Sequence, residues 1–396
     1  MKVVLICTSD SGGAGLCCQR ICNALNSIGV ECKMLVLYKK TSNKNIVQVG
    51  RVKNLFWRMF NKLLRICGLE VTEFNYLFNL CHSTGNFYSS PYSIINISKH
   101  PLIRNADIVH LHWINGMIDF RTFFGNINKP IIWTLHDENL FYGMAHYESA
   151  VIKDNKKEHI YYTDKKNGIA KAKKLGIVFL SNMMYNKYNK HEIIINATKT
   201  IINNSVDTNI FTPHDKNIGR KKYGISSTDI VFIFVSATLT DKRKGLSILQ
   251  EAIKSFNNPQ MKILAIGNPD RLQPDKSTIF AGSLHDGKEL SIAYSCGNYL
   301  VMPSIQEAFA QAPLEAMACG IPAIVSPVSG TEELITPFNG IICDGFTVND
   351  FVNGISSALS TCYDGNIIRK DIIERFSPEV MARKYTAFYK KIYKCF

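Results

Sequence analysis

The chain has 396 residues, of which 46% are hydrophobic and 20% are charged, and its formal net charge is +14. This length exceeds one ordinary hydrophobic core and predicts two domains of about 100–200 residues each. The composition excludes a disordered chain, and no run reaches the roughly 18 apolar residues of a membrane span.

Lys and Arg are concentrated in the first half of the chain. Residues 1–190 hold 25 Lys/Arg against 12 Asp/Glu, whereas residues 191–396 hold 21 against 20. This asymmetry indicates an anionic partner on the N-terminal side. The twelve cysteines are scattered and form no C-x-x-C pair. We therefore expect reduced thiols in a cytosolic protein, because a chain of this size needs no disulfides.

The first half alternates short apolar runs with helical ones, which is the pattern of a parallel α/β sheet. The predicted strands are Lys2–Cys7, Cys32–Leu37, Ile108–His112, Ile131–Leu135 and Ile177–Leu180. The chain becomes irregular and polar over 199–213. We place the end of a first domain, 1–205, in this stretch.

Three glycines follow the first predicted strand, in SDSGGAGLCCQRICNAL. Gly12, Gly13 and Gly15 allow a ligand to approach the backbone, and the N-terminus of the following helix offers N–H groups to an anion. The pattern is not the complete G-x-G-x-x-G motif. A tight turn with a purely structural role is the alternative interpretation.

Residues 51–67, RVKNLFWRMFNKLLRIC, place apolar side chains on one face of a predicted helix and Lys and Arg on the other. This profile is typical of an interfacial helix on an anionic membrane. The alternative is a surface helix that covers the first sheet and leaves its cations in water. No nucleic-acid recognition motif accompanies the charge, so we expect no nucleic-acid partner.

Two histidine motifs follow later strands, DIVHLHW and PIIWTLHDENLF. His110 and His112 point to the same side of one strand. Without a third ligand we predict that they pack in the domain, and we expect no metal site. His136 and Asp137 come just past an apolar strand, at the end of a parallel sheet where ligands bind.

A second set of strands opens with DIVFIFVSA and defines a second domain, 206–376. Its predicted strands are Ile230–Ser236, Lys262–Gly267, Thr278–Phe280, Tyr299–Met302 and Ala323–Ser326. In residues 377–396, Ser377 is a suitable N-cap and Pro378 a suitable first helical residue. We predict that this terminal helix packs back on the first domain.

Two motifs follow strands of the second domain. In DKRKG, Lys242, Arg243 and Lys244 stand at a strand-to-helix turn, which suits a diphosphate. A solvated basic loop is the alternative. In EAFAQAPLEAM, Glu307 lies on a loop and Glu315 in the first turns of a helix. Each carboxylate can accept two sugar hydroxyls.

The string PSIQEAFAQAPLEAMACGIPAIVSPVSGTEELI resembles the glutamate-x7-glutamate signature of glycosyltransferase family 4, whose members are retaining enzymes of the GT-B fold. GGAG, HLHW, TLHD, SVDTNIFTP and DKRKG extend the likeness over nearly the whole chain. They are most similar to the branch that builds bacterial exopolysaccharide and colanic-acid-like chains. The resemblance implies an α/β GT-B fold, in which two Rossmann-like domains with doubly wound parallel sheets face a central cleft. The first domain is implied to be the acceptor side.

The resemblance also implies a role for each motif. Glu307 would bind hydroxyls of the donor sugar, and Glu315 would bind the ribose of the nucleotide. Lys244, assisted by Arg243, would neutralise the diphosphate, and His136 would lie near the reacting face of the sugar. The other implied donor-binding positions contribute backbone groups, and they are Gly13, Gly15, Phe309, Ala310, Gln311 and Ala312.

The implied donor is a nucleotide diphosphate sugar, UDP- or GDP-linked, with no cofactor and no metal. The implied acceptor is a lipid-linked oligosaccharide or a growing glycan, and the implied location is cytoplasmic or peripheral on the inner face of the cell membrane. Two residues depart from the family pattern: Thr238 stands where many members have arginine, and Ala310 where many have glycine. If that position needs a positive φ, the alanine is strained. A GT-B sugar-nucleotide epimerase and a non-catalytic homologue that binds sugar nucleotides or glycans are the alternative functions.

Overall fold

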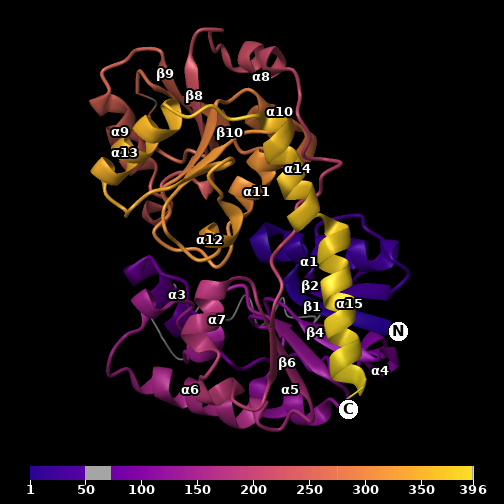
Figure 1. Ribbon diagram of the computed structural model, residues 1–396. Coiled ribbons are helices and arrows are strands. Elements are labelled where there is room, and N and C mark those ends of the chain that lie inside the picture. Colours follow the sequence, from indigo (N-terminus) through magenta and orange to yellow (C-terminus); the bar gives the residue numbers. More distant parts are fainter. Residues whose placement is uncertain (50–72, 274, 395) are drawn as a thin grey trace. The chain divides into compact units, whose positions relative to one another are not determined.

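The computed structural model describes residues 1–49, 73–273, 275–394 and 396, and these form two compact units (Figure 1). Unit 1 comprises Met1–Leu180, Tyr185–Ile202 and Ala382–Phe396, and unit 2 comprises Ser181–Met184 and Asn203–Met381. The predicted amphipathic segment 51–67 lies outside the described residues. No helix in the described part of the chain is long and apolar enough to cross a membrane.

Unit 1 is built on a seven-stranded parallel sheet with the order β3-β2-β1-β4-β5-β6-β7. The direction of winding reverses between β1 and β4, so these two strands form the switch point of the sheet. The strands are β1 (Lys2–Ser9), β2 (Glu31–Tyr38), β3 (Ile46–Gln48), β4 (Ile108–Leu111), β5 (Ile131–Thr134), β6 (Leu175–Phe179) and β7 (Thr198–Ile201). β4 and β5 are buried at every position, as parallel strands covered on both faces should be.

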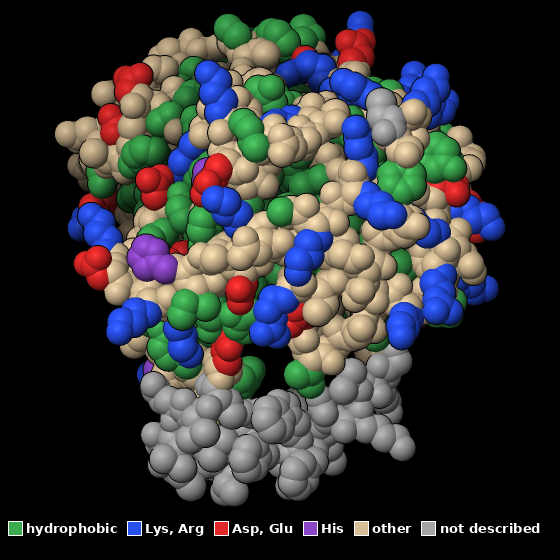
Figure 2. Space-filling view, turned by 90° about the horizontal axis from the view of Figure 1, so that it is seen from below, with side chains coloured by type: hydrophobic (Ala, Val, Ile, Leu, Met, Phe, Trp, Pro, Cys, Tyr) green, Lys and Arg blue, Asp and Glu red, His purple; other side chains and the backbone are tan. Residues whose placement is uncertain are grey.

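The helices of unit 1 connect these strands in the alternating order that a parallel sheet requires (Figure 1). They are α1 (Gly12–Ser27), α3 (Glu73–Thr84), α4 (Pro101–Asn105), α5 (Phe120–Asn126) and α6 (Lys156–Ile169), with short 3-10 turns η1 (Asn139–Phe141), η2 (Glu148–Ala150) and η3 (Glu192–Ile194). α7 (Asn182–Tyr188) spans a change of unit. Viewed from below, the face of unit 1 near α5 and α6 carries many Lys and Arg side chains with Asp and Glu between them (Figure 2).

Unit 2 repeats the plan with a six-stranded parallel sheet in the order β10-β9-β8-β11-β12-β13. Its switch point lies between β8 and β11. The strands are β8 (Ile230–Thr238), β9 (Met261–Asn268), β10 (Thr278–Gly282), β11 (Tyr299–Met302), β12 (Ala323–Val325) and β13 (Gly340–Ile342). The helices are α8 (Lys216–Tyr223), η4 (Lys242–Lys244), α9 (Leu246–Ser255), α10 (Gly287–Ser295), α11 (Gln311–Ala318), α12 (Thr331–Leu334), α13 (Val348–Leu359) and α14 (Gly365–Phe376).

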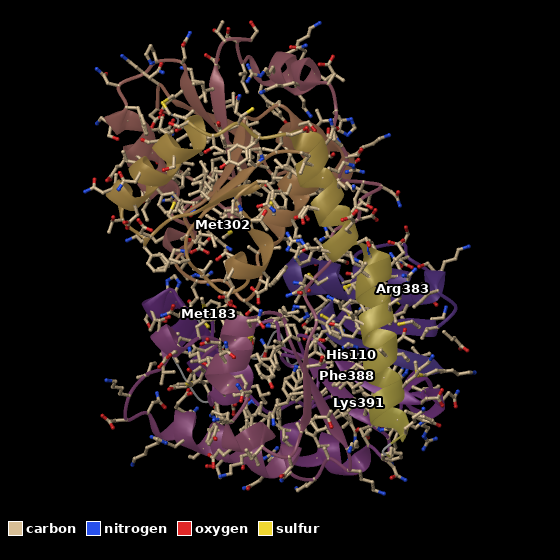
Figure 3. All side chains as sticks on the ribbon, in the orientation of Figure 1. His110, Met183, Met302, Arg383, Phe388 and Lys391 are labelled. Carbon is tan, nitrogen blue, oxygen red and sulfur yellow. The ribbon has the colours of Figure 1, made fainter. Side chains whose placement is uncertain are left out.

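The final helix, α15 (Pro378–Lys394), begins in unit 2 and continues in unit 1 from Ala382 onward. Figure 3 labels Arg383, Phe388 and Lys391 along it. Arg383 and Lys391 are exposed, whereas Phe388 is buried against Gly176 of β6, where a Cβ would lie 3.1 Å from the Phe388 ring. This close fit places an aromatic ring of α15 directly on the first sheet.

The predicted doubly wound α/β fold is confirmed, but three strands escaped prediction. These strands, β3, β7 and β13, all lie at sheet edges and have three or four residues. A short, half-buried edge strand lacks the continuous apolar run by which a central parallel strand is found. The sequence also provides no signal that Ser181–Met184 group with unit 2.

Candidate functional site

Unit 2 brings Lys244 and Glu307 together at its switch point. Lys244 lies in the turn after β8, and Glu307 lies in the loop after β11, the strand beside β8. Between them stands Gly245, with a φ of 77°, where a Cβ would lie 2.3 Å from the backbone oxygen of Pro303. Only glycine fits this position, and its lack of a side chain lets the two loops touch.

The Lys244 ammonium and the Glu307 carboxylate form an ion pair, with 2.5 Å between Nζ and Oε1. Their side chains are 29% and 14% exposed. A pair that is partly open to solvent adds little to stability. A ligand can therefore replace this contact at little cost. The Lys244 ammonium would then bind an anionic group of the ligand, and the Glu307 carboxylate would accept hydrogen bonds from its hydroxyls.

Arg243 lies next to Lys244 in the chain but is bound elsewhere. Its guanidinium forms a fork on the Asp241 carboxylate, with Nη2–Oδ2 at 2.7 Å and Nε–Oδ1 at 3.2 Å. Thr238, at the end of β8, is exposed. The predicted help of Arg243 at a diphosphate thus requires it to leave Asp241, whereas Lys244 already lies at the Glu307 loop.

The loop that carries Glu307 is fixed by the segment after β12. Ser326 donates to the backbone oxygen of Met302 at 3.2 Å, and Ser329 donates to that of Ala308 at 3.0 Å. Phe309 is buried against Gly330, where a Cβ would lie 2.6 Å from its ring. The Phe309 side chain is thus part of the core, and only its backbone could meet a ligand.

Ala310 is not strained. It precedes α11 with a φ of −73° and a ψ of 133°, an extended conformation open to any residue. It offers no side-chain cap to the helix, whose first turn contains the half-buried Gln311 and Ala312. The conditional strain raised by the sequence therefore does not arise.

Glu315, the second glutamate of the signature, is more deeply placed than Glu307. It lies on α11, is 8% exposed, and its Oε2 accepts a hydrogen bond from the Tyr294 hydroxyl at 3.1 Å. The structure therefore joins Lys244 directly to Glu307 and leaves Glu315 one helical segment away, held by α10.

In unit 1, the two glycines predicted to contact donor play different parts. Gly13 is exposed, and a Cβ there would meet nothing within 4 Å. Gly15 is buried, and a Cβ there would lie 2.6 Å from the backbone oxygen of Ser9. Gly15 thus lets α1 pack on the end of β1, while Gly13 stands open at the helix N-terminus.

His110 lies on β4, His112 follows it, and His136 follows β5; the first two are buried and His136 is partly buried. His110 is held by Tyr389 at 2.7 Å and by Thr134 at 2.8 Å, which confirms the predicted packing role. The rings of His112 and His136 share a hydrogen bond of 2.9 Å between Nδ1 and Nε2. Burial lowers the pKa of His110 to about 3 and that of His136 to about 4. These rings are therefore neutral at physiological pH.

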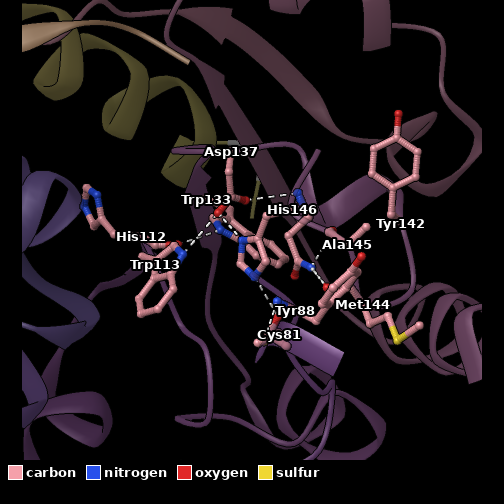
Figure 4. Close-up of polar contacts among 12 residues, drawn as sticks. Cys81, Tyr88, His112, Trp113, Trp133, Asp137, Tyr142, Met144, Ala145 and His146 are labelled. Atoms are coloured by element: carbon pink, nitrogen blue, oxygen red, sulfur yellow. Dashed lines mark hydrogen bonds and ion pairs between the residues drawn. The ribbon is translucent and has the colours of Figure 1, made fainter. Parts of the chain in front are cut away.

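Asp137 is held by three donors. Its Oδ2 accepts from Trp113 Nε1 at 3.0 Å and pairs with His146 Nδ1 at 2.5 Å, and its Oδ1 accepts from the backbone of Asn139 at 3.0 Å (Figure 4). Burial would raise the Asp137 pKa, but His146 and these hydrogen bonds hold it below its usual value. Ser89 contacts the other ring nitrogen of His146 at 3.0 Å.

The loop after Asp137 is braced by two charged residues of α6. Lys165 Nζ donates to the backbone oxygens of Asn139 and Tyr142, and Glu158 accepts from the backbone N–H groups of Gly143 and Met144. These contacts fold the loop back toward Asp137, so that His146 can contact it. His146 escaped prediction, because only this tertiary bracing places it at the site.

A pocket in unit 1 is lined by side chains from this set. Those from the ends of β4 and β5 include His112, Trp113, His136 and Asp137, and His146 joins them. Its residues thus come from β4, β5 and the braced loop. In the described part of the chain, no group of three His, Cys, Asp or Glu side chains is arranged to hold a metal ion.

A protein-family model matches part of unit 2. Residues 215–375, which contain Lys244, Glu307 and Glu315, match the family model "Glycosyl transferases group 1". These residues are therefore similar to a group 1 glycosyltransferase domain. The match agrees with the predicted family, and it covers the unit whose switch point carries the ion pair.

Curated relatives are similar over about half of the chain. The D-inositol 3-phosphate glycosyltransferase of Kribbella flavida is 25% identical over 217 residues, which cover 49% of this chain and 51% of that protein. The N-acetyl-alpha-D-glucosaminyl L-malate synthase of Bacillus anthracis is 25% identical over 218 residues, which cover 50% and 55%. The chain thus spans about half the length of these relatives.

Solved structures share the fold over the whole chain. Sucrose-phosphate synthase from Thermosynechococcus elongatus has a TM-score of 0.70 at 16% identity and covers 100% of both chains. Anabaena HepE, solved in complex with UDP, has a TM-score of 0.64 at 15% identity and covers 99% of this chain and 100% of that one. The two parallel sheets, of seven and six strands, are those of a GT-B fold.

Proposed function

We propose that the group 1 glycosyltransferase domain works with unit 1 as a retaining enzyme that moves a hexose from a nucleotide diphosphate sugar to a glycan. The observation that carries the proposal is the Lys244–Glu307 pair at the β8/β11 switch point, inside the segment that matches the family. A cation for phosphate and a carboxylate for hydroxyls, at the carboxyl ends of parallel strands, suit a sugar nucleotide.

In this proposal the donor replaces the contacts of the ion pair. Glu307 turns to the hydroxyls of the sugar, and Lys244 turns to the diphosphate, whose charge it stabilises as the bond to the sugar breaks. Glu315 binds the ribose, and backbone N–H groups at the start of α11 face the phosphates. The acceptor hydroxyl attacks on the face that the diphosphate leaves, and the departing phosphate takes its proton. His136 lies near the reacting face.

We further propose a lipid-linked or growing bacterial polysaccharide as the acceptor. HLHW, TLHD and DKRKG support this choice through their similarity to the exopolysaccharide branch. Residues 51–67 support a peripheral position on an anionic membrane, because their spacing would place apolar side chains on one face of a predicted helix and Lys and Arg on the other. Changing Arg58, Lys62 and Arg65 to Glu should release the protein from anionic vesicles, and unaltered co-sedimentation would contradict this membrane role.

The experiment that tests the donor site is a thermal-shift screen against UDP, GDP, ADP, CMP and their common sugar conjugates. Wild-type protein and Glu315→Ala are compared. A shift for one nucleotide that the variant loses identifies the donor and places it at the signature. No shift with any nucleotide would contradict the proposal.

A second assay separates the proposal from its alternatives. Sugar transferred to an acceptor supports a glycosyltransferase. An isomerised sugar nucleotide formed without acceptor identifies an epimerase, and nucleotide binding without turnover identifies a binding protein.

A further inference from the structure

One motif of the sequence, SVDTNIFTP at 205–213, has no part in the proposed donor chemistry. The structure fixes it on two helices of unit 2. Arg369 of α14 donates from Nη1 to the backbone oxygen of Phe211 at 2.7 Å. Ser291 of α10 donates to the backbone oxygen of Thr212 at 2.9 Å and accepts from its N–H at 3.2 Å. These contacts hold Phe211 against α10.

Phe211 packs on a buried tyrosine of α10. The rings of Phe211 and Tyr294 lie 6.2 Å apart between centroids at an angle of 59°, and both side chains are buried. Gly287, the first residue of α10, allows this approach, because a Cβ there would lie 2.7 Å from Cγ2 of Ile210. The motif 205–213 therefore helps to fix the Tyr294 ring.

The Tyr294 hydroxyl contacts the second glutamate of the signature. It donates to Oε2 of Glu315 at 3.1 Å, and α10 and α11, which carry the two residues, lie side by side (Figure 1). A phenylalanine would fill the same space without the cost of burying a hydroxyl, so packing alone does not account for the oxygen. The hydroxyl acts on the carboxylate.

This contact restricts how the Glu315 carboxylate can turn. The terminal torsion of a glutamate is broad, and a hydrogen bond to one oxygen limits it. An ionised carboxylate has about four acceptor positions, so one donor leaves others for a ligand. Glu315 is 8% exposed, and a ligand therefore meets only a small part of it. An acceptor that is already oriented loses less conformational entropy on binding.

Resting on the proposed function, in which Glu315 binds the ribose, we infer that Tyr294 is a positioning residue that makes the donor site selective for ribonucleotides. The oriented carboxylate accepts from the 2′- and 3′-hydroxyls of the ribose together. A 2′-deoxyribose supplies only the 3′-hydroxyl and leaves a buried acceptor unpaired, and sites built to bind a hydroxyl reject such an analogue. The donor is therefore a ribonucleoside diphosphate sugar, and thymidine diphosphate sugars, whose pentose lacks the 2′-hydroxyl, bind poorly.

Calorimetry of the full chain tests this inference with UDP, GDP and ADP, each beside its 2′-deoxy form. The comparison uses the base that binds the wild type most tightly. We expect the wild type to prefer the ribonucleotide by at least ~10-fold, since one buried hydrogen bond is at stake. In Tyr294→Phe the affinity for the ribonucleotide should fall by about 5-fold and that for the deoxynucleotide by less than about 2-fold, because only the ribonucleotide uses both acceptor positions.

A merely structural role for Tyr294 would weaken both forms alike and leave the ratio of their affinities unchanged, and this result would overturn the inference. A wild type that binds both forms equally would overturn it as well. If the wild type binds none of these nucleotides, the proposed function fails and the inference fails with it. Binding with an unchanged ratio in Tyr294→Phe leaves the donor site standing and removes only the role of Tyr294.

Tyr299→Phe is the matched control. Tyr299 also lies in unit 2, and its hydroxyl donates to the backbone oxygen of Ala358 at 3.1 Å and not to the glutamate signature. This variant should keep the wild-type ratio, and thermal melting checks that each variant is folded. A fall in the ratio as large as that in Tyr294→Phe would overturn the inference.

A second variant tests the motif itself. Phe211→Leu retains the Tyr294 hydroxyl but removes the ring beside it. Its affinity ratio should therefore lie between those of the wild type and Tyr294→Phe. A wild-type ratio in Phe211→Leu would show that the motif 205–213 does not position Tyr294.

Discussion

In both units the candidate functional side chains follow central strands of the parallel sheet. The two sets differ in charge and in how firmly they are held. In unit 2 the switch point carries an ion pair, Lys244–Glu307, that is partly open to solvent. In unit 1 the corresponding edge carries the neutral imidazoles of His112 and His136 and one carboxylate, Asp137, which accepts three hydrogen bonds from its own unit. The charged groups of unit 2 can therefore change partners, whereas Asp137 in unit 1 is held in place by its hydrogen bonds.

Because of this difference, we expect mutations in unit 2 to affect mainly ligand binding and mutations in unit 1 to affect mainly the stability of the fold. A partly exposed ion pair contributes about 0–1 kcal/mol, so removing it should affect ligands more than folding. A network in which one carboxylate accepts three hydrogen bonds costs several times more to break, because the remaining donors lose their partner. Mutations at the two sites should therefore have different signatures.

The largest effect is expected at Glu307. Glu307→Ala should lower sugar transfer by at least ~100-fold, since the carboxylate is proposed to hold the donor sugar, while the melting temperature changes little. Transfer is followed with the nucleotide sugar from the thermal-shift screen. Glu332→Ala removes an exposed carboxylate of the same unit and is the control. Unchanged turnover in Glu307→Ala would remove the assignment.

A loss of stability is expected at Asp137. In Asp137→Asn an amide group replaces one oxygen, so Trp113 Nε1, His146 or the backbone of Asn139 loses its acceptor. We expect about 2–3 kcal/mol of destabilisation. Urea unfolding followed by tryptophan fluorescence measures it. A loss no larger than that of Lys244→Ala would contradict the contrast between the units.

Acid should weaken unit 1. The folded pKa of His136, about 4, lies below the unfolded value of about 6.5. Between pH 6.5 and 4 the histidine is protonated in the unfolded chain but neutral in the folded chain. The free energy of unfolding therefore falls as the pH drops from 6.5 to 4. The slope is up to about 1.4 kcal/mol per pH unit for each such histidine. Urea midpoints at pH 7.5, 6 and 5 should show it, and His136→Gln should reduce the slope by one proton. An identical slope in that variant would contradict the burial argument.

The smallest of these effects is expected at Lys244. Lys244→Ala should weaken binding of the nucleoside diphosphate by about 10-fold, since one charge-assisted contact is lost. Calorimetry measures the affinity, and Lys242→Ala, an exposed lysine two positions earlier, is the control. Equal losses in the two variants would show that only general charge matters.

The sequence alone identified the two sheets, the second-domain motifs and the residues at the ends of central strands. Central parallel strands are continuous apolar runs, and ligand groups follow them within a few residues, so both are local signals. Glu307, Lys244, His136 and Asp137 were proposed as site residues in this way. The edge strands β3, β7 and β13 were missed because they have no such run.

Only the tertiary structure decided how the groups are paired. Lys244 meets Glu307 because Gly245 allows two loops to touch, and Arg243 turns to Asp241 instead. His146 reaches Asp137 because Lys165 and Glu158 of α6 brace the loop between them. Such pairings join residues far apart in the chain through side-chain packing and hydrogen bonds. Secondary-structure propensity and residue spacing cannot predict these pairings, because the sequence around each partner is that of an ordinary loop or helix.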